Sequence, residues 1–567
     1  MSSAEIEEVV NTAYAINGGD PRTSTCGNGE FSDDRFAFLF TPGTYTGLNV
    51  PVGYYTSVYG LGNAPTDTVF EGEKGVYCEQ SCLNFESGAL GTFWRSAENF
   101  HTKSNYQWEV GSGMTWAVSQ AAPLRNVKVD NSLLLFEYIP ESCCAAGFAS
   151  GGWNSGVDVG GSVSYGSQQQ FMTRSSSAGT FETPVWNGVF AGVTNPPNAR
   201  CGSLNDDGSS ERSSVSVEPT IPLVAEKPYI VTNDNGASFI LVIPSVHADT
   251  AGVPWDASGF PDSVSVDFSD VYVTQPTDTS AIINAKLAEG LHVVISPGVY
   301  ALDDSLFLQK DNQVILGLGL ATLTAPPNGK PCITVGDVDG VRIAGMLLEA
   351  GKFETTGALL QVGVSGSHAG AVTNPTILSD VFARVGGNVN GVGPVDTMFL
   401  IQSGYTIIDN TWLWRADHSV DGLVYNGDNP VKNGLQVKAN NVFAYGLASE
   451  HTIEDNVLWE GDNGVTFFYQ AEIMYDATDD VWGYSCYTLG ENVDTHTATG
   501  IGCYSYFRDA AVTAPRGIDT SSAMNVKIDK SLAVFLNGIA GSAISNTFND
   551  DGLEVNSTQQ AQYHCEA

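Results

Sequence analysis

Two glutamates near the C-terminal end are the residues whose spacing most suggests chemistry. The segment ASEHTIEDNVLWEGDNGVTFFYQAE runs from Ala448 to Glu472 and places Glu450 and Glu472 22 residues apart. In a parallel β-helix, residues one coil apart stand on neighbouring strands about 4.8 Å from each other. Two carboxyl groups that close repel each other, which raises the pKa of one of them. A protonated carboxyl beside an ionised one is the pair that acid-assisted cleavage of a glycosidic bond requires.

The spacing leaves two questions open. Carboxyl groups about 5–5.5 Å apart are typical of retaining glycosidases and groups about 6.5–9.5 Å apart of inverting ones, and sequence does not choose between them. The alternative interpretation is two solvated glutamates on a charged face, because the chain contains 63 acidic residues.

A short repeat indicates the fold that would bring these glutamates together. TIIDNTWLW begins at Thr406 and TIEDNVLW at Thr452, an offset of 46 residues, or two periods of 23. Asn440–Phe443 and ILSDVFARVGG at 377–387 have a similar pattern. Coils of 20–29 residues with Asn or Asp at the turns and no regular helix are typical of a parallel β-helix.

A longer repeat predicts that this fold occurs twice. The order of an apolar strand, PG-x-Y and GLG appears at 38–65 and again at 293–322, with offsets of 255 and 257 residues. A candidate helix precedes each copy, at 2–17 and 278–290. We therefore predict an all-β chain of two tandem parallel β-helix domains, each preceded by a short helix. A pair of β-sandwiches is the alternative, but it does not explain the duplicated motifs.

The duplication also predicts the domain boundaries. Residues 1–215 form the N-terminal β-helix domain, 216–262 a structured linker containing the strand-like runs YIVT and SFILVI, and 263–567 the C-terminal β-helix domain. We expect the two domains to pack together with a cleft between them, where ligand sites often lie.

The net charge limits which molecules the chain is expected to bind. The chain has 63 acidic and 24 basic residues, a net charge of −39. Such a surface repels nucleic acids, anionic membranes and acidic polysaccharides. A neutral polysaccharide is the expected substrate, and we expect a monomer. Solubility in a salty or acidic medium is the simpler explanation of the charge.

The cysteines suggest an oxidising compartment. Ten are present without the paired spacing of a zinc site, which favours disulfides and a secreted protein. The polar start MSSAEIEEVV is not a signal peptide, and no run of 18 apolar residues occurs. No metal, nucleotide or other cofactor motif is present, so we expect no cofactor.

Several ordered motifs resemble glycoside hydrolase family 55, the exo-β-1,3-glucanases or laminarinases. The resemblance covers nearly the whole chain and implies tandem right-handed β-helices of the pectate lyase type. The motifs are FLFTPGTY, GSQQQFMTRSS, WNGVFAGVTNPP, EKPYI, LAEGLHVVISPGVY, DGVRIAGMLLEAG, TWLWRADH, GLASEH and FFYQAEIMYD.

The resemblance implies roles for several residues. Glu472, in the YQ-x-E element, matches the general acid, and Glu450, in the EH pair, matches the residue that holds or activates the attacking water of an inverting reaction. Gln170 and Ser176 are the best matches for further polar contacts to that water. Because the family usually reads TRNS where this chain has TRSS, Ser175 is the alternative to Ser176.

Other residues are candidates for the same cleft. Asp417 and His418 could bind substrate or simply close a turn, and His451 could orient Glu450. Aromatic faces suit the C–H faces of glucose, although core packing is the simpler role for each. The candidate sugar platforms are Trp153, Trp186, Trp414, Trp459, Tyr469 and Trp482.

Three functions from different classes remain. The first is a secreted hydrolase that removes glucose units from the non-reducing end of β-1,3-glucan. The second is a polysaccharide lyase, which the charge disfavours because lyases of this fold need a base and usually Ca²⁺ for acidic sugars. The third is a non-catalytic surface or carbohydrate-binding protein.

Overall fold

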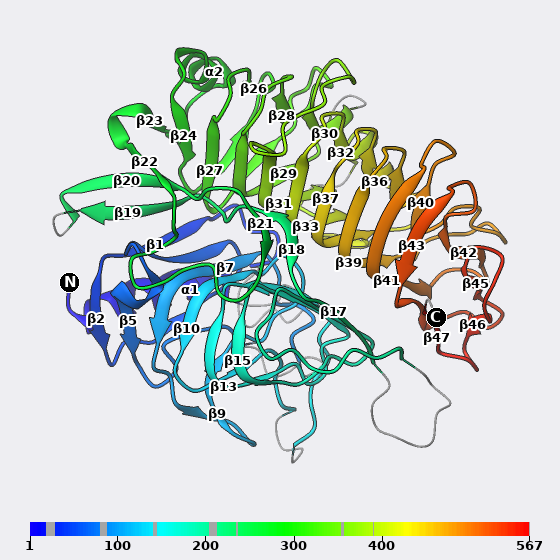
Figure 1. Ribbon diagram of the computed structural model, residues 1–567, viewed down its shortest axis with the longest axis horizontal. Coiled ribbons are helices and arrows are strands. Elements are labelled where there is room, and N and C mark those ends of the chain that lie inside the picture. Colours follow the sequence, from blue (N-terminus) through cyan, green and yellow to red (C-terminus); the bar gives the residue numbers. More distant parts are fainter. Residues whose placement is uncertain are drawn as a thin grey trace.

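The computed structural model describes residues 1–18, 29–79, 88–139, 144–202, 213–233, 236–352, 356–388 and 391–565. Two stacks of parallel strands lie side by side, the first drawn in blue and cyan and the second from green to red (Figure 1). Both are parallel β-helices, as the sequence predicts. In the described residues the regular α-helices are α1 (Ser3–Asn17) and α2 (Ser280–Glu289).

Local capping explains where the two helices begin and end. Ser2 accepts a hydrogen bond from the backbone N–H of Glu5, whose side chain accepts one from the backbone N–H of Ser2, a capping box at the start of α1. Thr279 caps the start of α2, and Gly290 ends it with a φ of 100°.

The N-terminal coil is built from one large sheet, whose strands pair in parallel apart from the β8–β9 hairpin. Its apolar interior forms a continuous core that includes Val58, Phe100, Leu124 and Phe190. The main strands are β1 (Phe36–Phe40), β2 (Gly43–Thr46), β4 (Thr56–Gly60), β5 (Thr68–Glu71), β7 (Arg95–Thr102), β8 (Tyr106–Gln107), β9 (Ser112–Thr115), β10 (Leu124–Val129), β11 (Ser132–Leu134), β12 (Gly152–Ser155), β13 (Asp158–Ser164), β14 (Gln170–Arg174), β15 (Ser177–Phe181), β16 (Asn187–Ala191) and β17 (Ser214–Glu218).

The C-terminal coil has two sheets around a second continuous core. The sheet that faces the N-terminal coil runs through β23 (Val271–Val273), β24 (His292–Ile295), β27 (Val314–Thr324), β29 (Arg342–Glu349), β31 (Thr376–Val385), β33 (Thr406–Arg415), β37 (Phe443–Glu450), β39 (Gly464–Glu472), β41 (Thr495–Phe507), β44 (Ser531–Gly538) and β47 (Ala561–His564). The other contains β26 (Leu306–Leu308), β28 (Ile333–Val335), β30 (Thr356–Val362), β32 (Val395–Ile401), β36 (Val431–Val437), β38 (Val457–Trp459), β40 (Tyr487–Leu489), β42 (Thr513–Asp519), β45 (Ala543–Phe548) and β46 (Val555–Asn556).

The long repeat corresponds to equivalent strands in the two coils. β1 pairs with β4, so that Phe40 lies opposite Gly60, and β24 pairs with β27, so that Ile295 lies opposite Gly317. The PG-x-Y element forms β2 in the first coil and β25 (Val299–Ala301) in the second. The duplication inferred from sequence is therefore a duplication of structure.

The parallel β-helix that the short repeat predicts is confirmed, but the two copies of the repeat do not occupy equivalent strands, so the period of 23 residues was wrong. TIIDNTWLW forms β33, whereas TIEDNVLW covers a turn and then β38 in the other sheet of the coil. Coil length also varies, because Trp414 pairs with Glu450 and Glu450 with Glu472, steps of 36 and 22 residues. Insertions between strands lengthen individual coils without changing the stacking.

The segment between the coils forms antiparallel strands packed against both. β18 (Ile221–Val224) pairs with β21 (His247–Thr250), and β19 (Tyr229–Asn233), β20 (Ser238–Ile243) and β22 (Val264–Asp267) form a second small sheet. Mixed apolar clusters join the coils, and one packs Trp153 and Met172 of the first against Ile407 and Tyr445 of the second.

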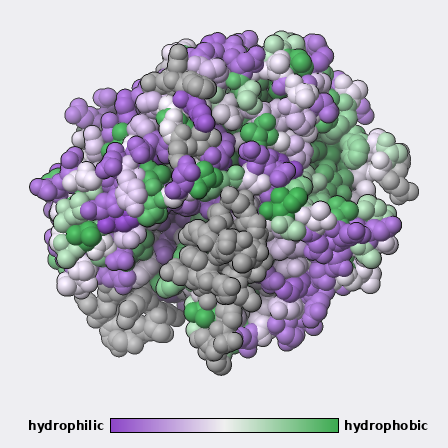
Figure 2. All heavy atoms as spheres, turned by 180° about the vertical axis from the view of Figure 1, so that it is seen from behind, coloured by the Kyte–Doolittle hydropathy of each residue, from purple (hydrophilic) through white to green (hydrophobic). Residues whose placement is uncertain are grey.

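Two disulfides occur among the described residues. Cys201 is bonded to Cys565, which ties the N-terminal coil to the end of the C-terminal one, and Cys486 is bonded to Cys503. None of the described helices is long and apolar enough to span a bilayer. The face of the molecule in Figure 2 is largely hydrophilic, and apolar residues gather in one area near its right edge.

Candidate active site

The two glutamates lie on neighbouring strands, in register. β37 and β39 pair in parallel and place Glu450 directly beside Glu472. Each strand turns a corner at a left-handed residue, Asn410 in β33, Gly446 in β37 and Phe468 in β39, and these corners are aligned. Asn and Gly adopt this backbone conformation most easily, so they mark where the strands bend.

Beyond the corner, successive side chains of each strand alternate in direction. One points into the interior of the C-terminal coil and the next points toward the N-terminal coil. Leu413, Leu447, Tyr469 and Ala471 belong to the apolar core inside the coil. Their neighbours face the other way and form a floor of three strands: Trp412 and Trp414, then Ala448 and Glu450, then Gln470 and Glu472.

The N-terminal coil covers this floor. Gln120, Trp153 and Gln170 of the first coil and Trp412 and Gln470 of the second line a cavity of about 20 Å³. Trp153 packs against Gly446 of β37. Only glycine fits there, because a Cβ at this position would lie 2.3 Å from the indole Cδ1. Gly446 thus lets the two coils approach closely beside the glutamates.

Polar atoms without partners surround this cavity. Gln170 Oε1, Gln470 Oε1, Trp153 Nε1 and Trp412 Nε1 are buried and have no hydrogen-bond partner within the protein. The volume is enough for about one water molecule, and these donors and acceptors could bind it.

A hydrogen-bonded chain leads from the first coil to Glu450. Ser150 Oγ donates to Gln120 Oε1 at 2.6 Å, and Gln120 Nε2 donates to Glu450 Oε1 at 3.2 Å. Gln170 Nε2 donates to the carbonyl of Ser150, which holds that loop in place. Gln120, held by Ser150, therefore reaches Glu450 across the domain boundary.

Burial sets the protonation of both glutamates. Loss of solvent raises the pKa of Glu472 to about 7, Asp417 adds to that increase, and a hydrogen bond from Tyr475 opposes it. Burial first, and the nearby charge of Glu472 second, raise the pKa of Glu450 well above its usual value. A proton is thus held on this pair under mildly acidic conditions.

His451 lies among three carboxyl groups. Its Nε2 is 3.9 Å from an oxygen of Glu450, of Glu472 and of Asp417. The closest oxygens of the two glutamates are therefore within twice that distance of each other. Burial lowers the pKa of His451 to about 4, so the imidazole is neutral near neutral pH.

The DH pair predicted from sequence lies beside this group. His418 Nε2 is 2.8 Å from Glu30 Oε1 and its Nδ1 is 3.1 Å from Asp417 Oδ1. Although burial opposes it, these two carboxylates raise the pKa of His418 well above its usual value. Burial alone would raise the pKa of Asp417, but His418 holds it below its usual value. The pair is a fixed cation and anion beside the acid.

A second set of charges fixes the two coils relative to each other. Arg125 donates to both oxygens of Asp380 at 2.7 and 2.8 Å and to Asp409 at 2.9 Å. Its guanidinium also lies 4.0 Å from the ring centroid of Trp153. The members of this buried ion cluster are Arg125, Arg174, Lys227, Glu98, Glu226, Asp380 and Asp409.

Some candidate residues lie elsewhere, which corrects the sequence prediction. Trp459 and Tyr469 are fully buried inside the C-terminal coil, because each points inward in the alternation of its strand, and Trp482 is in the same core. Trp186 packs against the cluster around Tyr504. The three rings buried in that core offer no face to the site, whereas Trp186 is half-buried beside Tyr504, which pairs with Glu472 in register.

Ser176 does not line the cavity, as its expected contact with the attacking water requires. Its Oγ accepts a hydrogen bond from the backbone N–H of Val157 and donates to the carbonyl of Arg174, so it stabilises a corner of the N-terminal coil. Trp414 is on the floor beside Glu450, but it is buried between Trp412 and His418. Trp153 and Gln170 do line the cavity.

Gln120, Ser150 and Tyr475 were not predicted from the sequence. The one available signal was the polar Ser119–Gln120 pair inside the otherwise apolar run 116–124. Among the described residues, no group of three or more His, Cys, Asp or Glu side chains is arranged to hold a metal ion.

Comparison with known proteins shows the family to which the chain belongs. Residues 271–472 match the model of the LAM55 pectate lyase-like domain. The exo-β-1,3-glucanase of Streptomyces sp. (strain SirexAA-E / ActE) is 38% identical over 517 residues, which are 90% of this chain and 80% of that protein. The chain belongs to glycoside hydrolase family 55.

Solved structures extend the likeness to the whole fold. The structure of the Lam55A enzyme from Streptomyces sp. SirexAA-E superposes with a TM-score of 0.87 at 34% identity, covering 99% of this chain and 96% of that one. A glutamate-to-alanine variant of that enzyme in complex with glucose gives a TM-score of 0.86, also at 34% identity, with 99% and 95% covered. The family 55 fold therefore includes both coils and the segment between them.

Proposed function

We propose that this family 55 chain hydrolyses β-1,3-glucan from the non-reducing end, with Glu472 as the general acid. The observation that carries the assignment is the in-register pair of buried glutamates on β37 and β39, held beneath the N-terminal coil. A carboxyl whose pKa lies near 7 is still protonated in mildly acidic solution, and it can therefore donate a proton to the glycosidic oxygen.

In the proposed reaction, Glu472 donates its proton to the glycosidic oxygen as the bond from C1 to that oxygen breaks. A water molecule attacks C1 from the opposite face and loses a proton. Glu450, in its ionised form, holds this water and accepts the proton, while Gln120, itself held by Ser150, donates a hydrogen bond to the Glu450 carboxylate. Because its pKa is raised, the Glu450 carboxylate is a stronger base than a solvated glutamate when it is ionised.

The substrate assignment follows from the family and from charge. The enzymes that this chain resembles include one described as an exo-β-1,3-glucanase and one solved with glucose. A net charge of −39 suits a neutral glucan. Two disulfides support a secreted, extracellular protein, and the proposed working form is the monomer.

The experiment is laminarin hydrolysis followed by ¹H NMR from the first minutes. Inversion at a β-linkage releases the α-anomer first, and exo attack releases one small sugar from the start. Glu472→Gln should lose about 10²–10⁴-fold in kcat, while the exposed Glu491→Gln should retain full activity. Early release of the β-anomer would exclude inversion, and full activity in Glu472→Gln would exclude the assigned acid.

A further inference from the structure

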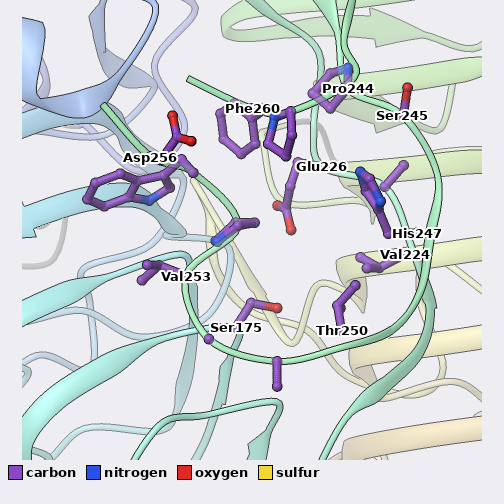
Figure 3. A pocket seen from close by; sticks show the side chains of 16 residues that line it. Ser175, Val224, Glu226, Pro244, Ser245, His247, Thr250, Val253, Asp256 and Phe260 are labelled. Atoms are coloured by element: carbon purple, nitrogen blue, oxygen red, sulfur yellow. The ribbon is translucent and has the colours of Figure 1, made fainter. Parts of the chain in front are cut away.

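A second cavity lies away from the glutamates, between the linker segment and the N-terminal coil. Its volume is about 320 Å³, at the lower end of the range for small-molecule sites. It shares no lining residue with the cavity beside Gln170. Figure 3 shows the carboxylate of Glu226, from the segment between the coils, pointing into its centre, with Ser175 of the N-terminal coil below it and Thr250 and His247 on the right.

The walls of this cavity are preformed. Trp255 donates its indole N–H to the carbonyl of Gly156 at 2.8 Å, which anchors the loop to the N-terminal coil. The ring of Phe260 packs on Tyr229 of β19, with centroids 5.3 Å apart. Val253 and Val224 add apolar surface on opposite sides of the cavity (Figure 3). A ligand would meet a surface that is already in place.

Its polar atoms retain capacity for a ligand. Glu226 accepts two hydrogen bonds from Arg174, at 2.6 and 2.9 Å, which leaves other lone pairs of the carboxylate free to accept donors. The hydroxyl of Thr250 is buried and has no hydrogen-bond partner within the protein. Ser175 Oγ accepts from Arg174 at 3.2 Å and can still donate. The cavity therefore offers both acceptors and donors beside apolar surface.

The charges decide the class of ligand. Glu226 and the exposed Asp256 disfavour an anion. A cation is not required either, because Arg174 already pairs with Glu226. A neutral molecule with several hydroxyls and an apolar C–H face matches both the polar atoms and the apolar surface.

We propose that this cavity is a second carbohydrate site, which binds one neutral monosaccharide of glucose size. It extends the proposed function, because glucose released by hydrolysis would be present to occupy it. Glu226 also belongs to the buried ion cluster, and Arg174 lies 5.3 Å from the ring of Trp153, so an occupied site would touch the group that holds the two coils together.

The test is binding of radiolabelled glucose by equilibrium dialysis at millimolar concentrations, together with a crystal structure at the same concentrations. The full chain should bind two glucose molecules at saturation, one beside Glu472 and one in this cavity. Val253→Trp fills the cavity and should bind one, while Val253→Ile should still bind two. Both variants should hydrolyse laminarin at the unmodified rate, because Val253 is outside the catalytic group.

A smaller substitution than Val253→Trp tests the same site with less risk of misfolding. Thr250→Val removes the buried hydroxyl with little change in volume, and should weaken glucose binding at this site at least threefold. The proposal fails if the unmodified chain binds a single glucose, if electron density appears in the cavity only at molar glucose, or if Val253→Trp still binds two. Loss of laminarin hydrolysis in the unmodified chain, with two glucose molecules bound, would instead overturn the proposed function alone.

Discussion

Replacing Glu472 with glutamine should stabilise the protein at alkaline pH while it removes activity. The folded state raises the pKa of this carboxyl from its usual 4.5 to about 7. Between these values the folded protein keeps a proton that the unfolded chain has lost, so its stability falls as the pH rises from 4.5 to 7. Glutamine does not ionise, so the variant does not lose this part of its stability as the pH rises.

The size of the effect follows from the two pKa values. A difference of about 2.5 units at 1.36 kcal/mol per unit gives roughly 3 kcal/mol. An unfolding entropy of about 2.1 cal/mol/K per residue is roughly 1.2 kcal/mol/K for 567 residues, so 3 kcal/mol corresponds to about 2.5 °C in Tm. Loss of the Glu472 charge also lowers the pKa of Glu450, which acts in the same direction.

Scanning calorimetry between pH 4 and pH 8.5 measures this difference. The Tm of Glu472→Gln minus that of the unmodified protein should rise by about 2–3 °C across the range. The exposed Glu491→Gln removes the same charge without burial and serves as the matched control. A Tm difference that stays constant with pH, or that falls as the pH rises, would refute the idea that burial sets the protonation of this carboxyl.

Four further outcomes follow from the site and the domain contact. Gln120→Leu breaks the chain to Glu450 and should lower kcat about 10²-fold, with little change in Tm. Tyr475→Phe removes a hydrogen bond that lowers the pKa of the acid, so the alkaline limb of kcat/KM against pH should move to higher pH. Arg125→Met leaves the buried carboxylates of Asp380 and Asp409 with one cation each, Lys227 and Arg174, and should reduce the free energy of unfolding by about 3–5 kcal/mol in denaturant titration. Reduction of the Cys201–Cys565 disulfide should lower the Tm in calorimetry with dithiothreitol, because the bond closes a loop of 364 residues.

The sequence was informative wherever the signal was local or duplicated. PG-x-Y and GLG predicted two coils because each motif occupies equivalent strands in both. The spacing of Glu450 and Glu472 predicted their register because a single coil of 22 residues joins the two positions. The repeated TI-x-DN motif misled, since matching letters fell on strands of different sheets.

Contacts between the two coils could not be predicted in the same way. Gln120 reaches Glu450 across 330 positions, and Arg125 reaches Asp380 across 255. No periodicity within one coil specifies which loops of the other will lie opposite. Tyr469 was misplaced for a related reason: the corner at Phe468 sets which side chains point inward, and a phenylalanine gives no sign of a left-handed residue.

The chemistry of the site depends on the presence of two coils rather than one. Glu450 and Glu472 point outward from the C-terminal coil, and on an isolated coil they would be solvated and would ionise near their usual pKa. Packing of Gln120, Trp153 and Gln170 over this floor removes solvent and supplies hydrogen bonds in its place. The buried ion cluster fixes that packing, because Arg125 and Arg174 of one coil bind Asp409 of the other. The duplication of a structural repeat thus produces a protonated acid that neither repeat could provide alone.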